Sequence, residues 1–223
     1  MNLAVSRAET FPLSPSRPRA ARPARDYGEL LSKAVILTLF SAMAARLAQN
    51  ALATGHVTGM LLVASESLVV VLTLFRRTAA AVDRSWRARL LTMASTFGPP
   101  LVRPAATALA PEMWTVAISG VGLAIVVLGK LSLGRSFGLA PANRGVVCSG
   151  LYRIVRHPIY LGYLITHIGF VIAHPAGWNM WTLAAADVAL LLRAICEERT
   201  LARDSQYRSY MQRVRWRILP GVF

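Results

Sequence analysis

The sequence predicts an all-α protein: a polytopic helical bundle integral to a membrane, with five to six membrane segments and a C-terminal helix on the cytoplasmic side. Two observations predict this class. The 223-residue chain is 55% hydrophobic and only 16% charged, whereas a soluble domain carries about 25% charged residues. Its apolar residues are gathered in long runs, with a mean hydropathy of +0.47, which is typical of a chain that has lipid as its solvent.

The charge of the chain is strongly basic, with 25 Lys and Arg against 10 Asp and Glu and a formal net charge of +15. Only two of these cations are lysines, Lys33 and Lys130, and the others are arginines. In a soluble protein this balance would suggest a nucleic-acid partner. Here the arginines lie between apolar runs, where the positive-inside rule and anionic lipid headgroups account for them. We therefore expect the lipid bilayer, and no nucleic acid, as a partner.

Residues 1–26 are a basic arm rich in Pro, Arg, Ser and Ala. We expect this arm to be disordered, because it has too little apolar surface to fold. A signal peptide is the alternative, since an apolar run follows the arm. The long charged lead-in, with no polar mature domain behind it, favours a retained membrane anchor.

Residues 27–133 are expected to form the N-terminal transmembrane helices, with spans near 30–48, 57–75 and 114–133. A strongly basic loop follows the second span. After it, residues 90–102 are apolar but are interrupted by Gly-Pro-Pro, and they fall short of the roughly 20 residues of a straight span. The number of membrane segments is five or six, depending on whether this piece crosses.

Residues 134–223 begin with a polar, glycine-rich stretch and continue with two shorter apolar helices, near 159–173 and 178–195. A basic amphipathic tail, 193–223, ends the chain. When every arginine-rich stretch is placed on one side of the membrane, both termini are cytoplasmic.

The first candidate site lies where the polar stretch meets the next apolar helix. Pro158 is expected where that helix begins or kinks, which frees backbone groups before it. On a continuous helix, residues four apart share a face, which gives two sets, Tyr152 with Arg156 and Tyr160, and Arg153 with His157. The alternative is an ordinary membrane edge with snorkelling arginines and interfacial tyrosines.

The second candidate site is the end of the last apolar helix, which carries Arg193, Glu197 and Glu198. Arg193 and Glu197 are four apart, so a mutual salt bridge is the structural alternative to a catalytic role. The acids are notable because the chain has so few.

The tail carries a third candidate site, in which Tyr207 and Tyr210 are three apart on an expected helix. Further along, Trp216 and Ile218 are expected on the headgroup layer. The alternative for the tail is an interfacial amphipathic helix without a further role.

Taken in order, these motifs resemble the isoprenylcysteine carboxyl methyltransferase family, whose superfamily includes membrane phospholipid methyltransferases. The resemblance covers about residues 134–223 and rests on Arg156-His157-Pro158-x-Tyr160-x-Gly162, an apolar hairpin interrupted at His174-Pro175, Glu197-Glu198-x-x-Leu201, Tyr207-x-x-Tyr210 and Pro220. The chain departs from this pattern before the first tail tyrosine. Many members of the family carry Phe-Gly there, at a longer spacing from the tyrosine, whereas this chain has Asp-Ser-Gln directly before Tyr207.

The resemblance implies a compact helical membrane fold that binds S-adenosyl-L-methionine on the cytoplasmic side. Arg156, Arg193 and Glu197 would be the catalytic residues, where cofactor and acceptor meet. The cofactor-binding residues would be Tyr152, His157, Tyr160, Glu197, Glu198, Tyr207 and Tyr210.

The acceptor that we expect is a lipophilic small molecule, such as a lipid, an isoprenoid or a thiol, that enters from the bilayer. An acceptor carboxylate would need only to be oriented, whereas an amine or a thiol would need a base, for which Glu197, Glu198 and His157 are candidates. The arginine-rich, lysine-poor composition hints at a GC-rich genome and a bacterial inner membrane. The competing functions are a membrane reductase that uses NADPH, similar to sterol reductases, and a non-catalytic membrane protein.

Four further ionisable residues lie in apolar segments. His167 and His174 are seven apart, but no third ligand is near in the sequence, so we predict no metal site. We interpret Glu66 as structural, with the Ser65 hydroxyl beside it. For Asp187 a structural role and a functional role both stay open. It lies eleven residues before Glu198, a spacing that places the two on one helix face.

Overall fold

The structure is a computed structural model that describes residues 27–54, 57–103 and 108–222, so the predicted arm 1–26 lies outside the described residues. The described chain is mostly helical. Its α-helices are α1 (Tyr27–Thr54), α2 (Val57–Phe75), α3 (Trp86–Phe97), α4 (Glu112–Leu133), α5 (Pro158–Ala173), α6 (Gly177–Leu201) and α7 (Ser205–Arg213). Shorter elements are the strands β1 (Ala81–Val82) and β2 (Ala142–Asn143) and the 3-10 turns η1 (Pro99–Leu101), η2 (Gly134–Ser136) and η3 (Gly150–Arg153).

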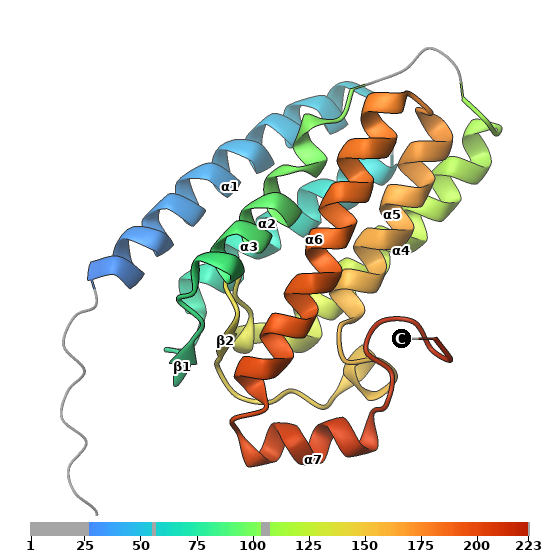
Figure 1. Ribbon diagram of the computed structural model, residues 1–223. Coiled ribbons are helices and arrows are strands. Elements are labelled where there is room, and N and C mark those ends of the chain that lie inside the picture. Colours follow the sequence, from blue (N-terminus) through green and yellow to red (C-terminus); the bar gives the residue numbers. More distant parts are fainter. Residues whose placement is uncertain (1–26, 55–56, 104–107, 223) are drawn as a thin grey trace, which may run out of the picture.

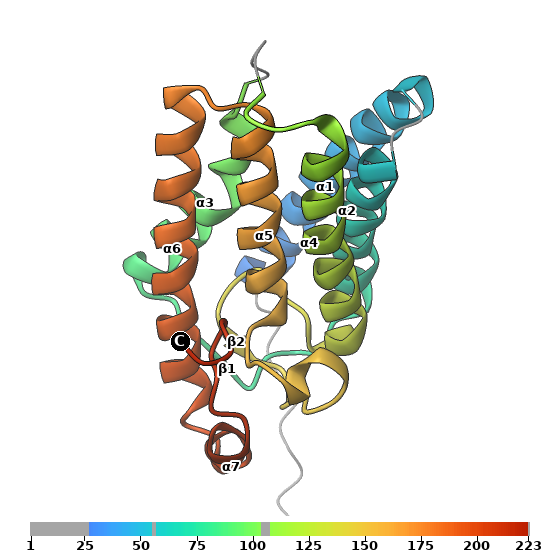
Figure 2. The same cartoon turned by 90° about the vertical axis from the view of Figure 1, so that its right-hand side faces the viewer.

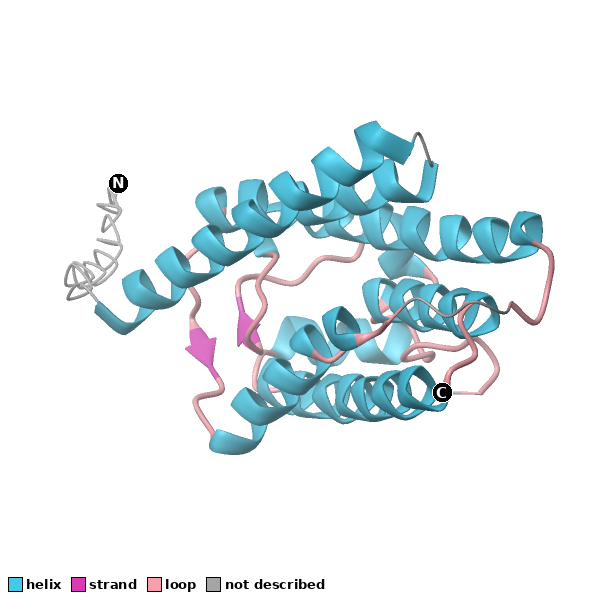
Figure 3. Ribbon diagram, turned by 90° about the horizontal axis from the view of Figure 1, so that it is seen from above, coloured by secondary structure: helices cyan, strands magenta, loops and turns pink. Residues whose placement is uncertain are grey.

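Six of the helices form an elongated bundle, and the short α7 lies across one end of it (Figure 1). Neighbours pack in the order α1, α2, α4, α5, α6, α3, which is visible in Figure 2 from the α1–α2 pair on one side to α6 and α3 on the other. Seen from above in Figure 3, the helices lie in more than one layer. A cavity that several of these helices line lies within the bundle.

Glycines bring α4 and α5 into the closest contact of the bundle. A Cβ atom on Gly162 would lie 2.6 Å from the Gly122 carbonyl oxygen, and one on Gly122 would lie 2.7 Å from the Gly162 carbonyl oxygen. Gly129 and Gly169 make similar approaches one heptad further along each helix. Small residues at such an interface are typical of helix packing in membranes, where dispersion contacts drive association.

Within the residues that the structure describes, two helical segments are long and apolar enough to cross a membrane, Glu112–Ser136 and Gly177–Leu201. Met60–Phe75 and Pro158–Ala173 are apolar but shorter. At 12 residues, α3 is about 18 Å long, too short to cross a hydrocarbon core of about 30 Å alone. The structure confirms a mostly helical chain, with two short strands, whereas the count of five to six membrane segments stays a prediction.

A buried ion pair joins α2 to α4. The fully buried Lys130 donates to the Ser65 hydroxyl at 2.8 Å and to its carbonyl at 2.9 Å. Its ammonium lies 3.7 Å from Glu66, which also accepts from the Ser65 hydroxyl at 3.0 Å. These contacts fit the structural interpretation of Glu66, and they add Lys130, which the sequence reasoning had not connected to it.

The arginine-rich segments gather at the α7 end of the bundle. β1 pairs antiparallel with β2 there, and the backbone N–H groups of Arg156 and His157 donate to Trp216 and Arg217. The last residues therefore fold back over the beginning of α5. The expectation that Ile218 lies on the headgroup layer was wrong, because Ile218 is fully buried in the core.

Candidate active site

The first turn of α5 and the C-terminal part of α6 meet in space. Tyr160 donates its hydroxyl hydrogen bond to Glu197 at 2.7 Å. The Arg193 guanidinium lies over the Tyr160 ring, 5.4 Å from its centroid. The two segments that the sequence singled out, 37 residues apart at this bond, thus form one site.

The chain around residues 150–160 is not a continuous helix, so the expectation of shared helix faces was wrong. η3 ends at Arg153, and α5 begins only at Pro158, with His157 at the N-cap position. Proline suits this first helical position because its missing N–H has no partner there. Arg153 is exposed and His157 is buried, so they do not form a pair on one face.

Glu198 is the centre of a buried polar cluster. Its carboxylate accepts from Arg156 Nε at 2.7 Å and from Arg217 Nε at 2.8 Å, and it lies 3.2 Å from His157 Nε2. Arg156 also donates to the Val214 carbonyl at 3.0 Å. The cluster therefore fastens the tail to α5 and α6, and Arg217 is a member that the sequence reasoning missed.

Arg193 is buried, and its partners lie on other elements. It donates to the Ser95 hydroxyl at 3.3 Å on α3 and to the carbonyl of Leu139. Its Nε atom is buried without a hydrogen-bond partner. None of the ion pairs among the described residues joins Arg193 to Glu197. The salt bridge that would have given these two residues a purely structural role is therefore not formed.

Three tyrosines form the wall of the site on the α7 side. Tyr207 and Tyr210 lie on α7 with ring centroids 5.5 Å apart, and Tyr210 donates to the Tyr152 carbonyl at 2.7 Å. Burial raises the pKa of all three phenols above its usual value, with smaller contributions from Glu197 at Tyr152, Glu198 at Tyr207 and Cys148 at Tyr210. Each phenol therefore keeps its proton at neutral pH.

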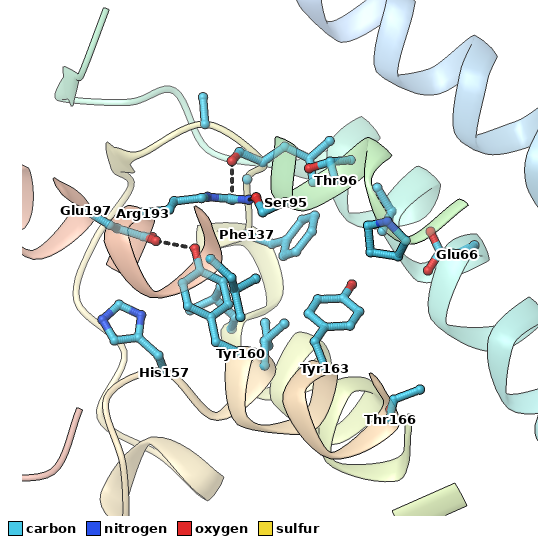
Figure 4. A pocket seen from close by; sticks show the side chains of 18 of the residues that line it. Glu66, Ser95, Thr96, Phe137, His157, Tyr160, Tyr163, Thr166, Arg193 and Glu197 are labelled. Atoms are coloured by element: carbon cyan, nitrogen blue, oxygen red, sulfur yellow. Dashed lines mark hydrogen bonds between the residues drawn. The ribbon is translucent and has the colours of Figure 1, made fainter. Parts of the chain in front are cut away.

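Most of these residues line a cavity of about 840 Å³ that extends between helices α1 to α6. Figure 4 shows Arg193 and Glu197 on one side of it and Glu66 on the opposite side, with Tyr163 between them. The predicted site residues that line the cavity are Tyr152, Arg156, His157, Tyr160, Arg193, Glu197, Tyr207 and Tyr210. Glu198 stands behind this wall and holds Arg156.

The part of the cavity beyond Tyr160 was missed as a site. Tyr163, Thr166, His167 and Phe170 continue the wall along α5, over a mostly apolar surface. Steps of three and four residues from Tyr160 place these side chains on one helix face. That periodicity was the signal that could have found them.

Comparison with known proteins gives a match to a family model. Residues 115–206 match the family model for phospholipid methyltransferases. This part of the chain is similar to that family. The match begins in α4 and ends in α7, less than half of the chain, and it confirms the resemblance stated from the motifs. No curated protein matches the sequence. The family indicates a methyltransferase that acts on membrane-associated substrates, and together with the two long apolar helices it supports a location at a membrane.

Proposed function

We propose that the protein transfers a methyl group from S-adenosyl-L-methionine to a lipophilic, membrane-associated acceptor at the cytoplasmic face. The observation that carries this proposal is the single cavity that joins two different environments. At one end it is lined by Arg193, Glu197 and tyrosines, and elsewhere by apolar side chains of α1, α2 and α5. A polar cofactor and an apolar acceptor need such neighbouring environments.

The residues present fit the cofactor. A volume of about 840 Å³ lies within the range of roughly 300–1,000 Å³ typical of small-molecule sites. The buried, unpartnered Nε of Arg193 suits the carboxylate of the cofactor. Glu197, which uses one oxygen for Tyr160, has a second oxygen for the amino group or the ribose diol.

In the mechanism, the chain's residues position the reactants and exclude water. When bound, the cofactor would supply an electrophilic methyl group on a sulfonium, whose sulfur is the leaving group as a neutral thioether. Arg193 is fixed by Ser95 and Leu139 and orients the reacting groups from α6. Arg156 is fixed by Glu198 and the tail carbonyls and holds the cavity wall on the α5 side. Tyr152, His157, Tyr207 and Tyr210 complete the cofactor end.

The orientation that we infer puts the α7 end in the cytoplasm, in a bacterial inner membrane with both termini on that side. The clustering of arginine-rich segments at this end supports it. The cofactor would then reach the site from the cytoplasm, and the acceptor would reach it from the bilayer.

A thermal-shift measurement on the detergent-purified protein tests the proposal. S-adenosylhomocysteine at 100 times its Kd should stabilise the protein by about 2.7 kcal/mol in the two-state limit, with NADPH as the comparison ligand. A labelled methyl donor should transfer label to the organic phase of a membrane-lipid extract. Stabilisation by NADPH alone would overturn the methyltransferase assignment in favour of a reductase.

A further inference from the structure

A histidine–aspartate pair lies in the part of the cavity that the proposed function leaves without a role. His167 Nδ1 on α5 and Asp187 Oδ1 on α6 are 2.6 Å apart. His167 is 8% exposed and lines the cavity. Asp187 stands behind it, with its side chain 24% exposed.

The hydrogen bond determines which nitrogen of His167 is available. In the neutral imidazole, a hydrogen bond from Nδ1–H to the carboxylate leaves the ring lone pair on Nε2. No described residue forms a hydrogen bond with Nε2, and the ring stacks on Tyr163 with centroids 6.4 Å apart. A histidine held in this way is arranged to accept a proton at Nε2, and the carboxylate behind it stabilises the imidazolium that results.

The position of the pair favours a chemical role. Ionisable side chains within apolar helices are costly and usually mark functional sites. Pairing with His167 explains how α6 tolerates Asp187. It does not explain why the paired histidine is part of a cavity wall rather than packed away from it.

The charges around the cavity limit the acceptor. Among the described residues that line it, the carboxylates are Glu66 and Glu197. Glu66 is paired with Lys130, and Glu197 accepts from Tyr160. The proposed function assigns the second oxygen of Glu197 to the cofactor, so neither carboxylate is available to a cationic acceptor beside His167, and a neutral acceptor fits best. Among neutral nucleophiles, a phenolic hydroxyl ionises near pH 10 and a thiol near 8.5, so the hydroxyl gains more from a base.

We propose that His167 is the general base for an acceptor with a phenol-like hydroxyl on an apolar molecule, and that Asp187 is its positioning residue. The proposal rests on the proposed function. The hydroxyl proton moves to Nε2, the oxygen forms a bond to the methyl carbon, and the methyl–sulfur bond breaks with its electron pair left on sulfur. The products are a methyl ether, neutral S-adenosylhomocysteine and an imidazolium beside Asp187. Tyr160 and His167 are two helical turns, about 10 Å, apart, so the reacting groups would lie beside Tyr163.

A spectroscopic test without methyl donor uses 2-dodecyl-4-nitrophenol, whose phenolate is coloured, at a pH where the free probe is mostly neutral. His167→Asn keeps a donor for Asp187 but lacks the nitrogen that accepts. The wild type and the control His174→Asn, whose side chain is outside the cavity lining, should increase the phenolate band, and His167→Asn should not. Equal spectra for wild type and His167→Asn, by equal ionisation or by lack of binding, overturn the proposal.

Turnover of 4-dodecylphenol with labelled donor gives the second readout. His167→Asn should slow transfer by about 10²- to 10⁴-fold, and the deficit should shrink for a ring-fluorinated analogue that ionises without a base. S-adenosylhomocysteine should stabilise both proteins equally. Absence of that stabilisation in the wild type would count against the proposed function itself. A wild type that binds S-adenosylhomocysteine but transfers no methyl to the phenol contradicts the base assignment alone.

Discussion

The Tyr160 hydroxyl and the Glu197 carboxylate, 2.7 Å apart, join the beginning of α5 to the end of α6 at the polar end of the cavity. The Arg193 guanidinium covers the same tyrosine ring. A cation, a phenol and a carboxylate are thus held together without a direct bond between the two charges. Each charged group keeps hydrogen-bonding capacity for a ligand.

Arg193 and Glu197 are expected to contribute directly to cofactor binding. Arg193→Ala and Glu197→Ala each remove a charged partner, for which about 1.5–3 kcal/mol is typical, so the Kd for S-adenosylhomocysteine should rise roughly 10- to 100-fold. Isothermal titration in detergent measures this. Arg199→Ala is the matched control, because Arg199 lies on the same helix and is exposed. Wild-type affinity in both alanine variants would return these residues to a structural role.

Glu198 is expected to matter for stability more than for ligand contact. Glu198→Gln removes the charge that compensates Arg156 and Arg217, and breaking a buried pair typically costs about 3–5 kcal/mol. Its melting temperature in detergent should fall clearly below that of the control Glu112→Gln, whose side chain is exposed. If the two variants have the same melting temperature, the polar cluster around Glu198 does not stabilise the fold.

The α4–α5 contact should not accept a methyl group. In Gly162→Ala the new Cβ would lie 2.6 Å from a backbone oxygen, and overpacking of this kind typically costs about 1–3 kcal/mol. Gly120→Ala on α4 is the control, since nothing lies within 4 Å of its Cβ position. Thermal unfolding should separate the two. Equal stability would mean that the helices can move apart at no cost.

The buried tyrosines predict a loss of stability at alkaline pH. Burial raises the pKa of the Tyr152, Tyr207 and Tyr210 phenols in the folded protein, whereas the unfolded chain releases these protons near pH 10. Their contribution is therefore complete below about pH 10 and is lost as pH rises toward the folded values. Melting curves at increasing pH measure the loss, and Tyr210→Phe should show a shallower decline. If the melting temperature of Tyr210→Phe fell as steeply with pH as that of the wild type, ionisation of Tyr210 would not contribute to the alkaline loss of stability.

The proposed orientation predicts where Cys148 can be labelled. Cys148 is exposed and lies just before η3, whose Tyr152 carbonyl accepts from Tyr210 on α7. A membrane-impermeant maleimide should therefore label it in inverted inner-membrane vesicles and not in intact spheroplasts. The variant Cys148→Ser measures the background labelling of Cys196. Labelling in spheroplasts would place the α7 end outside the cytoplasm.

Much of the site was predictable from local sequence. Pro158 marks the start of α5, and Tyr207 and Tyr210 do share the helix α7, because proline geometry and helical spacing act over a few residues. The motifs around Arg156 and Glu197 were sufficient to anticipate that the two segments meet and to state a resemblance that the family-model match confirms. The faces expected for Tyr152 and Arg153 were wrong, because the chain leaves the helix between η3 and α5.

The sequence by itself determined the helical class, the order of the apolar segments and the residues that surround the polar end of the cavity. Only the tertiary structure decided the partners: Glu198 with Arg217, Arg193 with Ser95, and His167 with Asp187. A spacing of four residues makes two side chains possible neighbours, but a buried charge pairs with whichever group lies at contact distance. That distance depends on how separate helices pack, and here glycines set how closely α4 and α5 approach.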